Sequence, residues 1–511
     1  MKPSRRTSRS ELVALAVGLL IFFVEILLIT AQTSPAHSVR KSPSAIATAK
    51  AQIAKGDLQA AETSLWSVLS SKPDDDEALA LLGTVRLRQQ RVPEAEALYK
   101  RVLQINPKNG PAQRTLAGIF AVEGKTSEAI QQLQMAASVA PNDIPLKVEL
   151  AQLYGKTSQF EQAVTTLESI PQSKFPLGAV PIKAAALVAV GRRGDAIKLV
   201  EIAKASPAVE VELAEVFVDG NLPDEALACL DLASGDAKRL PPRFYYLRGR
   251  ALAAKGEFDP ALAALQQASA EDPKSAETLD ALAELYARQN KRGDAVKALQ
   301  KAHGLAPNSL PILRHLVAEA ARAGDKHATL DSAAELSDKS PNDADDLYLA
   351  GAAMLEQNGQ AAAATLEAYV TLRPDDAKGQ LALGMAYVQL EHFTQARKAL
   401  ERSLKLDPKQ GEAEYQLALV AKGESKLNEA IEHLQRALDL QPKHLNALRM
   451  VGNLYLQTGE LEKAKDALER AESADAYSSQ TEYDLALVYN KLGEKDLAKQ
   501  HMDKFRKLKG Q

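Results

Sequence analysis

Residues 377–410 read AKGQLALGMAYVQLEHFTQARKALERSLKLDPKQ, and the spacing of their apolar residues decides the fold. In each half of the stretch, apolar and small residues recur every three or four positions, which is the period of an amphipathic helix. Pro408 ends the second helix because proline cannot donate to the helical hydrogen-bond ladder. The small residues Gly384 and Ala396 allow the two helices to approach closely. The stretch therefore predicts a helical hairpin whose apolar faces need neighbouring hairpins to cover them.

The same unit recurs along the chain with a period of 34 residues, shortened once to 33. Helix-ending prolines mark two runs of this period at Pro73, Pro107 and Pro141, then at Pro273, Pro307, Pro341, Pro374, Pro408 and Pro442. Between the runs, a small residue of the second helix keeps the phase at Ala163, Ala196, Ala226 and Ala261. Self-similarity at this period predicts a stacked array of hairpins.

These positions carry the pattern of a known family. One repeat reads Leu116, Ala117, Phe120, Ala129, Leu133, Ala136, Pro141, and another reads Leu282, Ala283, Tyr286, Ala295, Leu299, Ala302, Pro307. The chain resembles the tetratricopeptide repeat (TPR) family, although Arg86 stands at the aromatic position of one repeat. The resemblance covers about fourteen units, from about Ser42 to the C-terminus. It implies an all-α fold, a right-handed α-solenoid of helical hairpins.

The regular repeats and their interruptions predict three blocks. A first block of repeats spans residues 42–171, an irregular block spans 172–241, and a second regular block spans 242–511. Two proline-rich stretches interrupt the pattern, namely IPQSKFPLGAVP at 170–181 and KRLPPR at 238–243. Because proline disfavours a helical conformation in the residue before it, we expect both stretches to bend the stack.

The N-terminal segment predicts export from the cytoplasm. Residues 12–30, LVALAVGLLIFFVEILLIT, are apolar except for Glu25 and follow a basic cluster. Their length is typical of a membrane anchor, whereas the small residues at 34–36 favour a cleaved signal peptide, so residues 1–36 are one or the other. Residues 37–43 form a linker. In both cases the repeats cross the membrane, and the protein is an inner-membrane protein with extracytoplasmic repeats, or is periplasmic or secreted.

Composition and charge exclude several classes of function. The chain is 46% hydrophobic and 25% charged, with a net charge of −3, so it offers no basic field for nucleic acid. No phosphate-binding loop, dinucleotide fingerprint or nucleophile elbow occurs in the sequence. The repeats leave no segment for a catalytic domain. We therefore expect no enzyme activity, no catalytic residues and no cofactor.

The residues with metal-binding or nucleophilic chemistry have ordinary structural interpretations. Cys229 is the one cysteine, and it lies on an expected packing face, so we expect a small buried hydrophobe. The eight histidines have no compact metal-ligand spacing, which predicts surface histidines and no metal site. Thr329 stands where the second helix of a repeat normally carries alanine, which marks that repeat as degenerate.

The resemblance also implies where a partner binds, because the first helices of such arrays line a concave groove. Position five of the repeats gives most of the candidate groove residues, and position nine gives one more. These residues are Arg114, Tyr246, Asp280, Arg314, Tyr348, Tyr415, Arg449 and Tyr483 at position five, and Asn453 at position nine. Tyrosine and arginine are common interface hot spots. A groove with this composition would hold an extended or helical peptide by stacking on its tyrosines, while its arginines bind carboxylates.

Two hypotheses follow for the function. The first is a protein-protein interaction scaffold of the bacterial envelope, which binds a protein or peptide partner in the groove and contacts the membrane through residues 12–30 if the segment is not cleaved. The second is a polysaccharide-binding or export-assisting subunit whose groove tyrosines stack on sugar rings. Fold alone does not choose between them, because repeat arrays keep the packing code and vary the groove.

Overall fold

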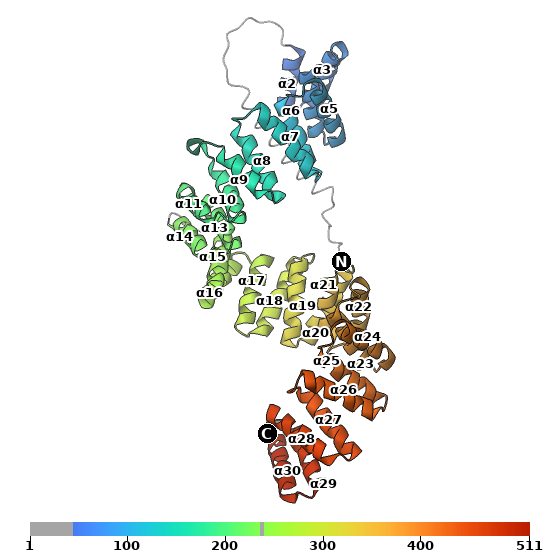
Figure 1. The fold of residues 1–511 in the computed structure, drawn as a ribbon. Coiled ribbons are helices and arrows are strands. Elements are labelled where there is room, and N and C mark those ends of the chain that lie inside the picture. Colours follow the sequence, from blue (N-terminus) through green and yellow to red (C-terminus); the bar gives the residue numbers. More distant parts are fainter. Residues whose placement is uncertain (1–43, 236–239, 511) are drawn as a thin grey trace, which may run out of the picture. The chain divides into compact units, whose positions relative to one another are not determined.

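The computed structural model describes residues 44–235 and 240–510. In these ranges every regular element is helical (Figure 1). The chain forms two compact units, residues 1–261 and 262–511, and the boundary falls inside helix α16 (Phe258–Glu271). The predicted segment at 1–36, the linker at 37–43 and part of KRLPPR lie outside the described residues. No helix of the described ranges is both long enough and apolar enough to cross a bilayer.

The described helices follow one another in pairs. In the first unit they are α2 (Ala45–Lys55), α3 (Leu58–Ser71), α4 (Asp76–Arg88), α5 (Val92–Ile105), α6 (Gly110–Val122), α7 (Thr126–Val139), α8 (Ile144–Lys156), α9 (Phe160–Glu168), α10 (Val180–Ala189), α11 (Arg193–Lys198), α12 (Val200–Ala203), α13 (Pro207–Asp219), α14 (Pro223–Ser234) and α15 (Pro242–Ala254). Two short 3₁₀ helices, η1 (Gln172–Lys174) and η2 (Leu177–Ala179), precede α10.

The second unit continues the alternation. Its helices are α17 (Ala276–Arg288), α18 (Arg292–Leu305), α19 (Leu310–Ala323), α20 (Lys326–Lys339), α21 (Ala344–Met354), α22 (Gly359–Leu372), α23 (Ala377–Gln389), α24 (Phe393–Leu406), α25 (Gly411–Gly423), α26 (Leu427–Leu440), α27 (Leu445–Thr458), α28 (Leu461–Ala474), α29 (Ser479–Leu492) and α30 (Lys495–Lys509). Residues 377–410 form α23 and α24, as the sequence predicts. Counting α11 and α12 as one divided helix, the described helices make fourteen successive pairs, which agrees with the expected repeat number.

Within each unit, every hairpin packs on the next. The second helix of one pair contacts the first helix of the following pair, as α24 contacts α25 and α26 contacts α27. First helices also contact one another, for example α19 with α21 and α23 with α25. The first helices of neighbouring hairpins therefore lie side by side, and residues at equivalent positions on them share a surface.

Local sequence fixes where the helices begin and turn. Asp75, Asp143, Asp376 and Ser478 each precede a first helix, and their side chains accept a hydrogen bond from a backbone N–H of its first turn. Most hairpin turns contain one residue in the left-handed conformation. That residue is glycine in several turns, such as Gly459 with φ of 87°, because glycine has no Cβ to clash.

Close approach inside the hairpins depends on a small residue of the first helix. In several hairpins that residue is a glycine, and for four of these glycines a Cβ built on the backbone would lie 2.6–2.9 Å from a large side chain of the second helix. The four contacts are Gly83 with Tyr99, Gly351 with Leu366, Gly384 with Leu400, and Gly452 with Leu468. At Gly384 the prediction of close backbone approach is confirmed.

A recurrent hydrogen bond ties the second helix of one hairpin to the first helix of the next. The partners are always 20 residues apart, and the later one is a tyrosine at the aromatic position of the repeat. The pairs are Gln134 with Tyr154 (2.7 Å), Glu367 with Tyr387, Gln435 with Tyr455 (2.7 Å) and Glu469 with Tyr489 (2.5 Å). We call this contact the tyrosine clasp. It joins consecutive repeats through a group that would otherwise be an unpaired, partly buried hydroxyl.

Arg86 replaces the tyrosine of the clasp by an ion pair. Its guanidinium donates to both carboxylate oxygens of Glu62, over 2.8 and 2.7 Å, and also to Gln89 over 2.7 Å. Arg86 is only 5% exposed, so its charge needs this partner. The hydrogen bond from Arg86 lowers the pKa of Glu62 to about 2. The polar residue thus ties α3 to α4 at the place where other repeats use an aromatic ring.

The irregular region differs locally from the regular hairpins. Helix α9 ends at Glu168, and the proline-rich stretch forms η1 and η2 before α10 begins at Val180. The following second helix is divided into α11 and α12. Ala196 nevertheless remains fully buried, so the packing phase predicted from the alanines continues through the region. The division of the chain into three blocks, the bends and the right-handed sense remain predictions.

Substitution of Gly384 by alanine, which adds one methyl group, tests whether the close approach of the two helices limits the size of this residue. The alanine Cβ would lie 2.6 Å from Cγ and Cδ2 of Leu400. We expect Gly384→Ala to destabilise the second unit by about 1–2 kcal/mol, because overpacking costs about 1–3 kcal/mol and the helix propensity of alanine returns up to about 1. The measurement is urea unfolding of the full chain, followed by circular dichroism.

Gly304→Ala in α18 is the matched control, because a Cβ added at Gly304 would have no neighbour within 4 Å. We expect it to raise the unfolding midpoint slightly, since alanine favours the helix by about 0.5–1 kcal/mol. If both variants stabilise the chain, close approach at Gly384 does not constrain the hairpin.

Acid should weaken the ion pair between Arg86 and Glu62. The folded-state pKa of Glu62, about 2, lies below its ordinary value of 4.5. The network therefore stabilises the fold fully above about pH 4.5, and the contribution is lost as the pH falls toward 2. Glu62→Gln should lower the urea midpoint at pH 6, and the gap to the wild type should narrow steadily below pH 4.5 and close only below about pH 2. A gap that is independent of pH would show that charge is not the basis of the contact.

Candidate functional site

The predicted groove residues share a position in the repeat, because each lies on the first helix of a hairpin, Arg114 and Tyr246 in the first unit and the others in the second. We call the set the first-helix surface, and it consists of Arg114 on α6, Tyr246 on α15, Asp280 on α17, Arg314 on α19, Tyr348 on α21, Tyr415 on α25, Arg449 and Asn453 on α27, and Tyr483 on α29. Asn453 is exposed and the others are half-buried. Members on neighbouring hairpins of one unit follow the line of contacting first helices.

Several charged members of this surface pair with the next repeat rather than standing free. Nε of Arg114 donates to Glu149 over 2.9 Å, and Nη2 of Arg314 donates to Asp346 over 2.9 Å. Burial alone would raise the pKa of Asp346, but the Arg314 guanidinium outweighs it and keeps the pKa below its ordinary value. These arginines therefore join consecutive repeats, and their charge is already neutralised inside the chain.

Asp280 makes a similar link through a histidine. The carboxylate of Asp280 lies 2.7 Å from Nδ1 of His315, one repeat further along. This hydrogen bond raises the pKa of His315 despite the opposing effect of burial. Asp280 is therefore already the hydrogen-bond partner of a residue in the next repeat.

The tyrosines of the surface each rest against another ring or a cation. Tyr348 packs on Tyr369, with ring centroids 5.3 Å apart, and Tyr483 packs on Phe505 at 5.2 Å. Tyr415 lies 4.7 Å from the ring of His444. These contacts hold the half-buried rings in place, while part of each ring remains accessible.

Tyr246 is held by cations instead of a second ring. The guanidinium of Arg243 lies 4.7 Å from its ring centroid, and that of Arg250 lies 5.8 Å away. Cations over an aromatic face are attracted by its quadrupole. The guanidinium groups of Arg243 and Arg250 therefore already cover part of the Tyr246 ring.

Arg449 and Asn453, both on α27, differ in their hydrogen bonding. Nδ2 of Asn453 donates to the buried Asp484 over 2.9 Å. Arg449 makes neither a hydrogen bond nor an ion pair with any residue that the structure describes, and its Nε is buried without an acceptor. Arg449 is therefore chemically distinct from Arg114 and Arg314, although all three occupy the same repeat position.

The expectation of surface histidines is wrong for two of them. His433 on α26 and His501 on α30 are each only 9% exposed. Nδ1 of His433 lies 2.6 Å from Glu414, and Nδ1 of His501 lies 2.6 Å from Glu482. In both cases the histidine and its carboxylate are 19 residues apart, on the two helices of one hairpin. A buried ring needs such a hydrogen-bond partner, which the hairpin supplies.

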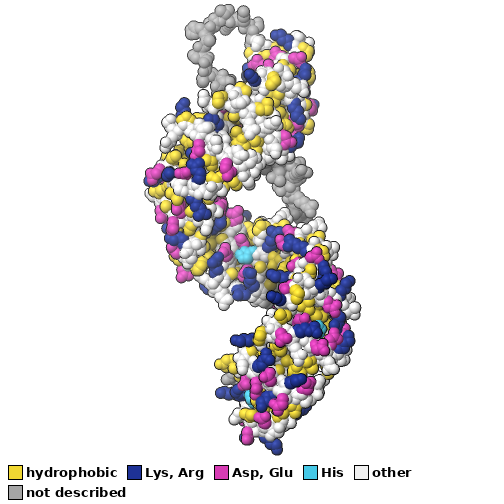
Figure 2. All heavy atoms as spheres, viewed as in Figure 1, with side chains coloured by type: hydrophobic (Ala, Val, Ile, Leu, Met, Phe, Trp, Pro, Cys, Tyr) yellow, Lys and Arg dark blue, Asp and Glu magenta, His cyan; other side chains and the backbone are white. Residues whose placement is uncertain are grey.

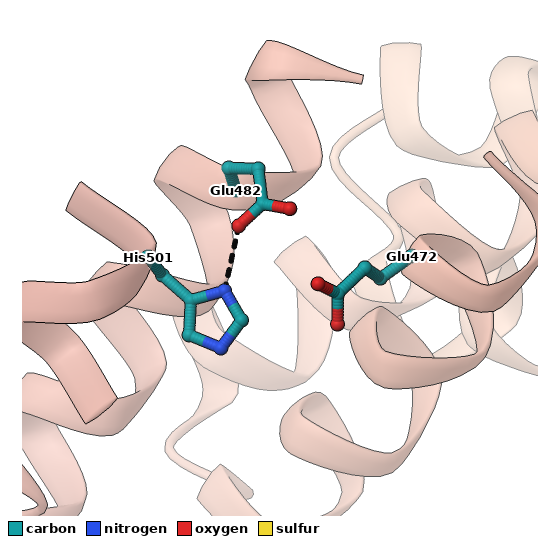
Figure 3. A group of neighbouring side chains, drawn as sticks. All are labelled: Glu472, Glu482 and His501. Atoms are coloured by element: carbon teal, nitrogen blue, oxygen red, sulfur yellow. Dashed lines mark hydrogen bonds and ion pairs between the residues drawn. The ribbon is translucent and has the colours of Figure 1, made fainter. Parts of the chain in front are cut away.

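One group of side chains has the residue types of a metal site. Oxygens of Glu472 and Glu482 and a ring nitrogen of His501 lie within 4.8 Å of one another (Figure 3). However, the ammonium of Lys504 lies 2.5 Å from Glu472 and 3.2 Å from Glu482. Lys504 supplies the positive charge that a cation would bring, so the group acts as an ion network joining α28, α29 and α30. The spacing of these residues in the sequence does not reveal the group, because its members come from three helices.

The expectation of a buried cysteine is confirmed. Cys229 is completely buried in α14, and burial raises the pKa of its thiol to about 12. A thiol with this pKa stays protonated near neutral pH and is a poor nucleophile.

Two open hollows occupy the same repeat position on the other side of the first helices. One, of about 420 Å³, is lined by residues of α26, α27 and α28, including Tyr455 and Arg470. The other, of about 380 Å³, is lined by residues of α16, α17 and α18, including Tyr286 and Lys301. In each hollow the lining comes from the first helix of one hairpin and from the second helices of that hairpin and of the hairpin before it.

Charges of both signs are intermixed on the surface. Figure 2 shows Lys and Arg side chains interspersed with Asp and Glu side chains over the visible face of the described residues, with hydrophobic atoms between them. Such a mixture favours specific local contacts over long-range attraction of a polyanion.

Comparisons with known proteins identify the repeats. The model of the cytochrome c-type biogenesis protein H TPR domain matches residues 365–474. One tetratricopeptide repeat model matches residues 52–119 and 86–147, and another matches residues 211–276. The matched segments fall in both units.

Two curated relatives are similar over nearly half of the chain. Cellulose synthase operon protein C of Escherichia coli (strain K12) is 26% identical over 257 residues, which are 48% of this chain and 21% of that protein. The putative cellulose synthase operon protein C of Escherichia coli O157:H7 is 26% identical over 256 residues, 48% of this chain and 20% of that protein. The matched region thus spans about a fifth of the length of these relatives.

Solved structures also show similarity. The APC/C hetero-tetramer Cut9-Hcn1 matches over 95% of this chain and 96% of that chain, with 16% identity and a TM-score of 0.35. MamA protein matches over 37% of this chain and 93% of that chain, with 21% identity and a TM-score of 0.29. The family models match the same helical hairpins that the structure contains, and the chain belongs to the tetratricopeptide repeat family.

Proposed function

We propose that the chain is a protein-protein interaction scaffold of the bacterial envelope, which binds an extended or helical segment of a partner protein along the first-helix surface. The observation that carries the proposal is the row of half-buried tyrosines on first helices, including Tyr348, Tyr415 and Tyr483, each held by a second ring. A tyrosine fixed in this way loses little side-chain entropy on binding and presents both an apolar ring and a hydroxyl.

The arrangement of charges supports a peptide as the ligand. Arg114, Asp280 and Arg314 are paired within the stack, so the accessible part of the surface is mainly aromatic and polar. Binding there displaces water from rings more than it separates charges, which favours a segment with apolar or aromatic side chains at regular spacing. The TPR family membership supports binding rather than catalysis as the task of the chain.

Similarity to known proteins and the N-terminal sequence both support the envelope location. The E. coli relative is described by its place in a cellulose synthase operon, and the matching family model is described as a cytochrome c-type biogenesis domain. The apolar run at residues 12–30 adds a route across or into the membrane. We propose the extracytoplasmic side of the inner membrane, or the periplasm or exterior if the segment is cleaved.

Similarity to cellulose synthase operon protein C favours a second candidate function. In this alternative the chain is a polysaccharide-binding or export-assisting subunit, and the same tyrosines stack on sugar rings. The two candidates share the surface but differ in the ligand. Sugar rings stack on the flat face of an aromatic side chain, whereas a peptide also uses hydrogen bonds and charge.

The combined substitution Tyr348→Ala and Tyr415→Ala tests the surface. We expect it to abolish capture of the partner by chemical crosslinking in native membranes, because it removes two aromatic contacts worth up to about 2 kcal/mol each. Crosslinked partners are identified by mass spectrometry and compared with those of the wild type.

Tyr477→Ala is the matched control, since Tyr477 is 84% exposed and lies between helices α28 and α29. It should leave partner capture unchanged. If the control loses the partner as completely as the double variant, the first-helix surface is not the binding site.

Binding of purified full-length protein to immobilised cellulose and other glycans separates the two candidates. The scaffold hypothesis expects no retention of the wild type on glycan columns. Retention that the double tyrosine variant loses would transfer the assignment to the polysaccharide candidate.

A further inference from the structure

The hollow lined by α16, α17 and α18 contains an open tyrosine clasp. Gln266 and Tyr286 are 20 residues apart, and both line this hollow. They have the residue types and the repeat positions of a clasp such as that of Gln435 with Tyr455. Within the described ranges, however, neither the Gln266 amide nor the Tyr286 hydroxyl makes a hydrogen bond. Both groups are therefore available to a ligand in the hollow.

Two lysines of α18 give the rim of this hollow an excess of positive charge. Lys301 forms no ion pair with any residue that the structure describes. The ammonium of Lys297, one helical turn earlier, lies 3.9 Å from a carboxylate oxygen of Asp294, which is the one acid in the lining. The Lys297 side chain is 79% exposed, and so long an exposed ion pair contributes little. Both ammonium groups can therefore pair with an anion.

The rest of the lining combines apolar and neutral polar groups. Leu279 and Leu282 of α17 supply an apolar surface beside Tyr286, and Ser269 of α16 adds a hydroxyl. The phenol, the amide and the serine hydroxyl can each donate or accept a hydrogen bond. The hollow thus places groups that suit the hydroxyls of a ligand next to groups that suit its negative charge.

The hollow lined by α26, α27 and α28 has a similar volume but the opposite chemistry. The hydroxyl of Tyr455 is already bonded to Gln435 over 2.7 Å, and the ammonium of Lys463 is paired with Glu460 over 2.7 Å. Acids also outnumber bases in this lining, which contains Asp439, Glu462 and Asp466 against Lys463 and Arg470. The open clasp and the positive rim therefore distinguish the hollow at Tyr286 from its counterpart in a later repeat.

We propose that the hollow at Tyr286 binds a small carboxylate that also carries hydroxyl groups, of the size of one sugar acid. The carboxylate pairs with Lys297 and Lys301, and the hydroxyls bond to Tyr286 and Gln266. Two lysines and one aspartate leave one positive charge, which matches a singly charged carboxylate better than a doubly charged phosphate. The site is separate from the first-helix surface and does not depend on the proposed scaffold function.

Three small probes that differ in one feature each test the site on the purified full-length protein. They are galacturonate, its methyl ester, which keeps the hydroxyls but has no charge, and cyclohexanecarboxylate, which keeps the ring and the charge but has no hydroxyls. Saturation-transfer NMR titrations give the dissociation constants, and inorganic phosphate serves as a competitor. We expect galacturonate to bind more tightly than either of the other probes.

Tyr286→Phe should weaken galacturonate binding about fivefold, and Lys301→Gln should weaken it about threefold. The matched controls are Tyr455→Phe and Lys463→Gln in the other hollow, which should leave the affinity unchanged. Melting followed by circular dichroism in the absence of ligand gives an independent readout. Tyr286→Phe should keep the wild-type midpoint because its hydroxyl has no partner in the chain, whereas Tyr455→Phe should lower the midpoint because it breaks a clasp.

Several results would overturn the site. They are equal affinities for galacturonate and its methyl ester, equal affinities for galacturonate and cyclohexanecarboxylate, displacement by an equal concentration of phosphate, or equal losses in the control variants. A midpoint lowered as much by Tyr286→Phe as by Tyr455→Phe would show that the clasp of Gln266 closes in solution. Binding that is lost instead in the Tyr348→Ala and Tyr415→Ala double variant would place the ligand on the first-helix surface.

Discussion

The structure depends on how closely the two helices of each hairpin can approach. In many of the hairpins, one position of the first helix is occupied by glycine or alanine. A leucine or tyrosine of the second helix fills the space beside this small residue. Where the residue is glycine, as at Gly384 and Gly452, even one added carbon would overlap Leu400 or Leu468. This contact sets the distance between helices, and with it the faces that remain for packing on the neighbouring hairpins.

The fold could be predicted in large part from the sequence because repeat packing is local. Each hairpin contacts its neighbours, so a period of 34 residues and the recurring alanines contain most of the information. Thr329 illustrates how far the code tolerates change. The threonine is fully buried in the alanine position, and its hydroxyl donates to the backbone carbonyl of Asp325 over 2.7 Å. The helix itself satisfies the extra polar group.

The candidate site was less predictable, because its character depends on pairs across repeats. Sequence analysis placed Arg314 on the partner-facing surface, but only the structure brings it to Asp346, 32 residues away. Likewise, His433 and Glu414 are 19 residues apart and meet because the hairpin folds back on itself. Residue type and repeat position select the candidates. The pairing in three dimensions determines which charged side chains form ion pairs between repeats and which stay available to a ligand.

The tyrosine clasp has a consequence for how such a chain changes in length. Its partners, such as Gln435 and Tyr455, belong to different repeats, so the contact spans the junction between one unit of the pattern and the next. Because the Gln435–Tyr455 and Glu469–Tyr489 contacts stand one period of 34 residues apart, losing or duplicating that period would rejoin equivalent partners. A gain or loss of any other length would leave a hydroxyl facing the wrong residue. At these junctions the spacing of the hydrogen bond therefore tolerates the gain or loss of whole repeats better than that of other lengths.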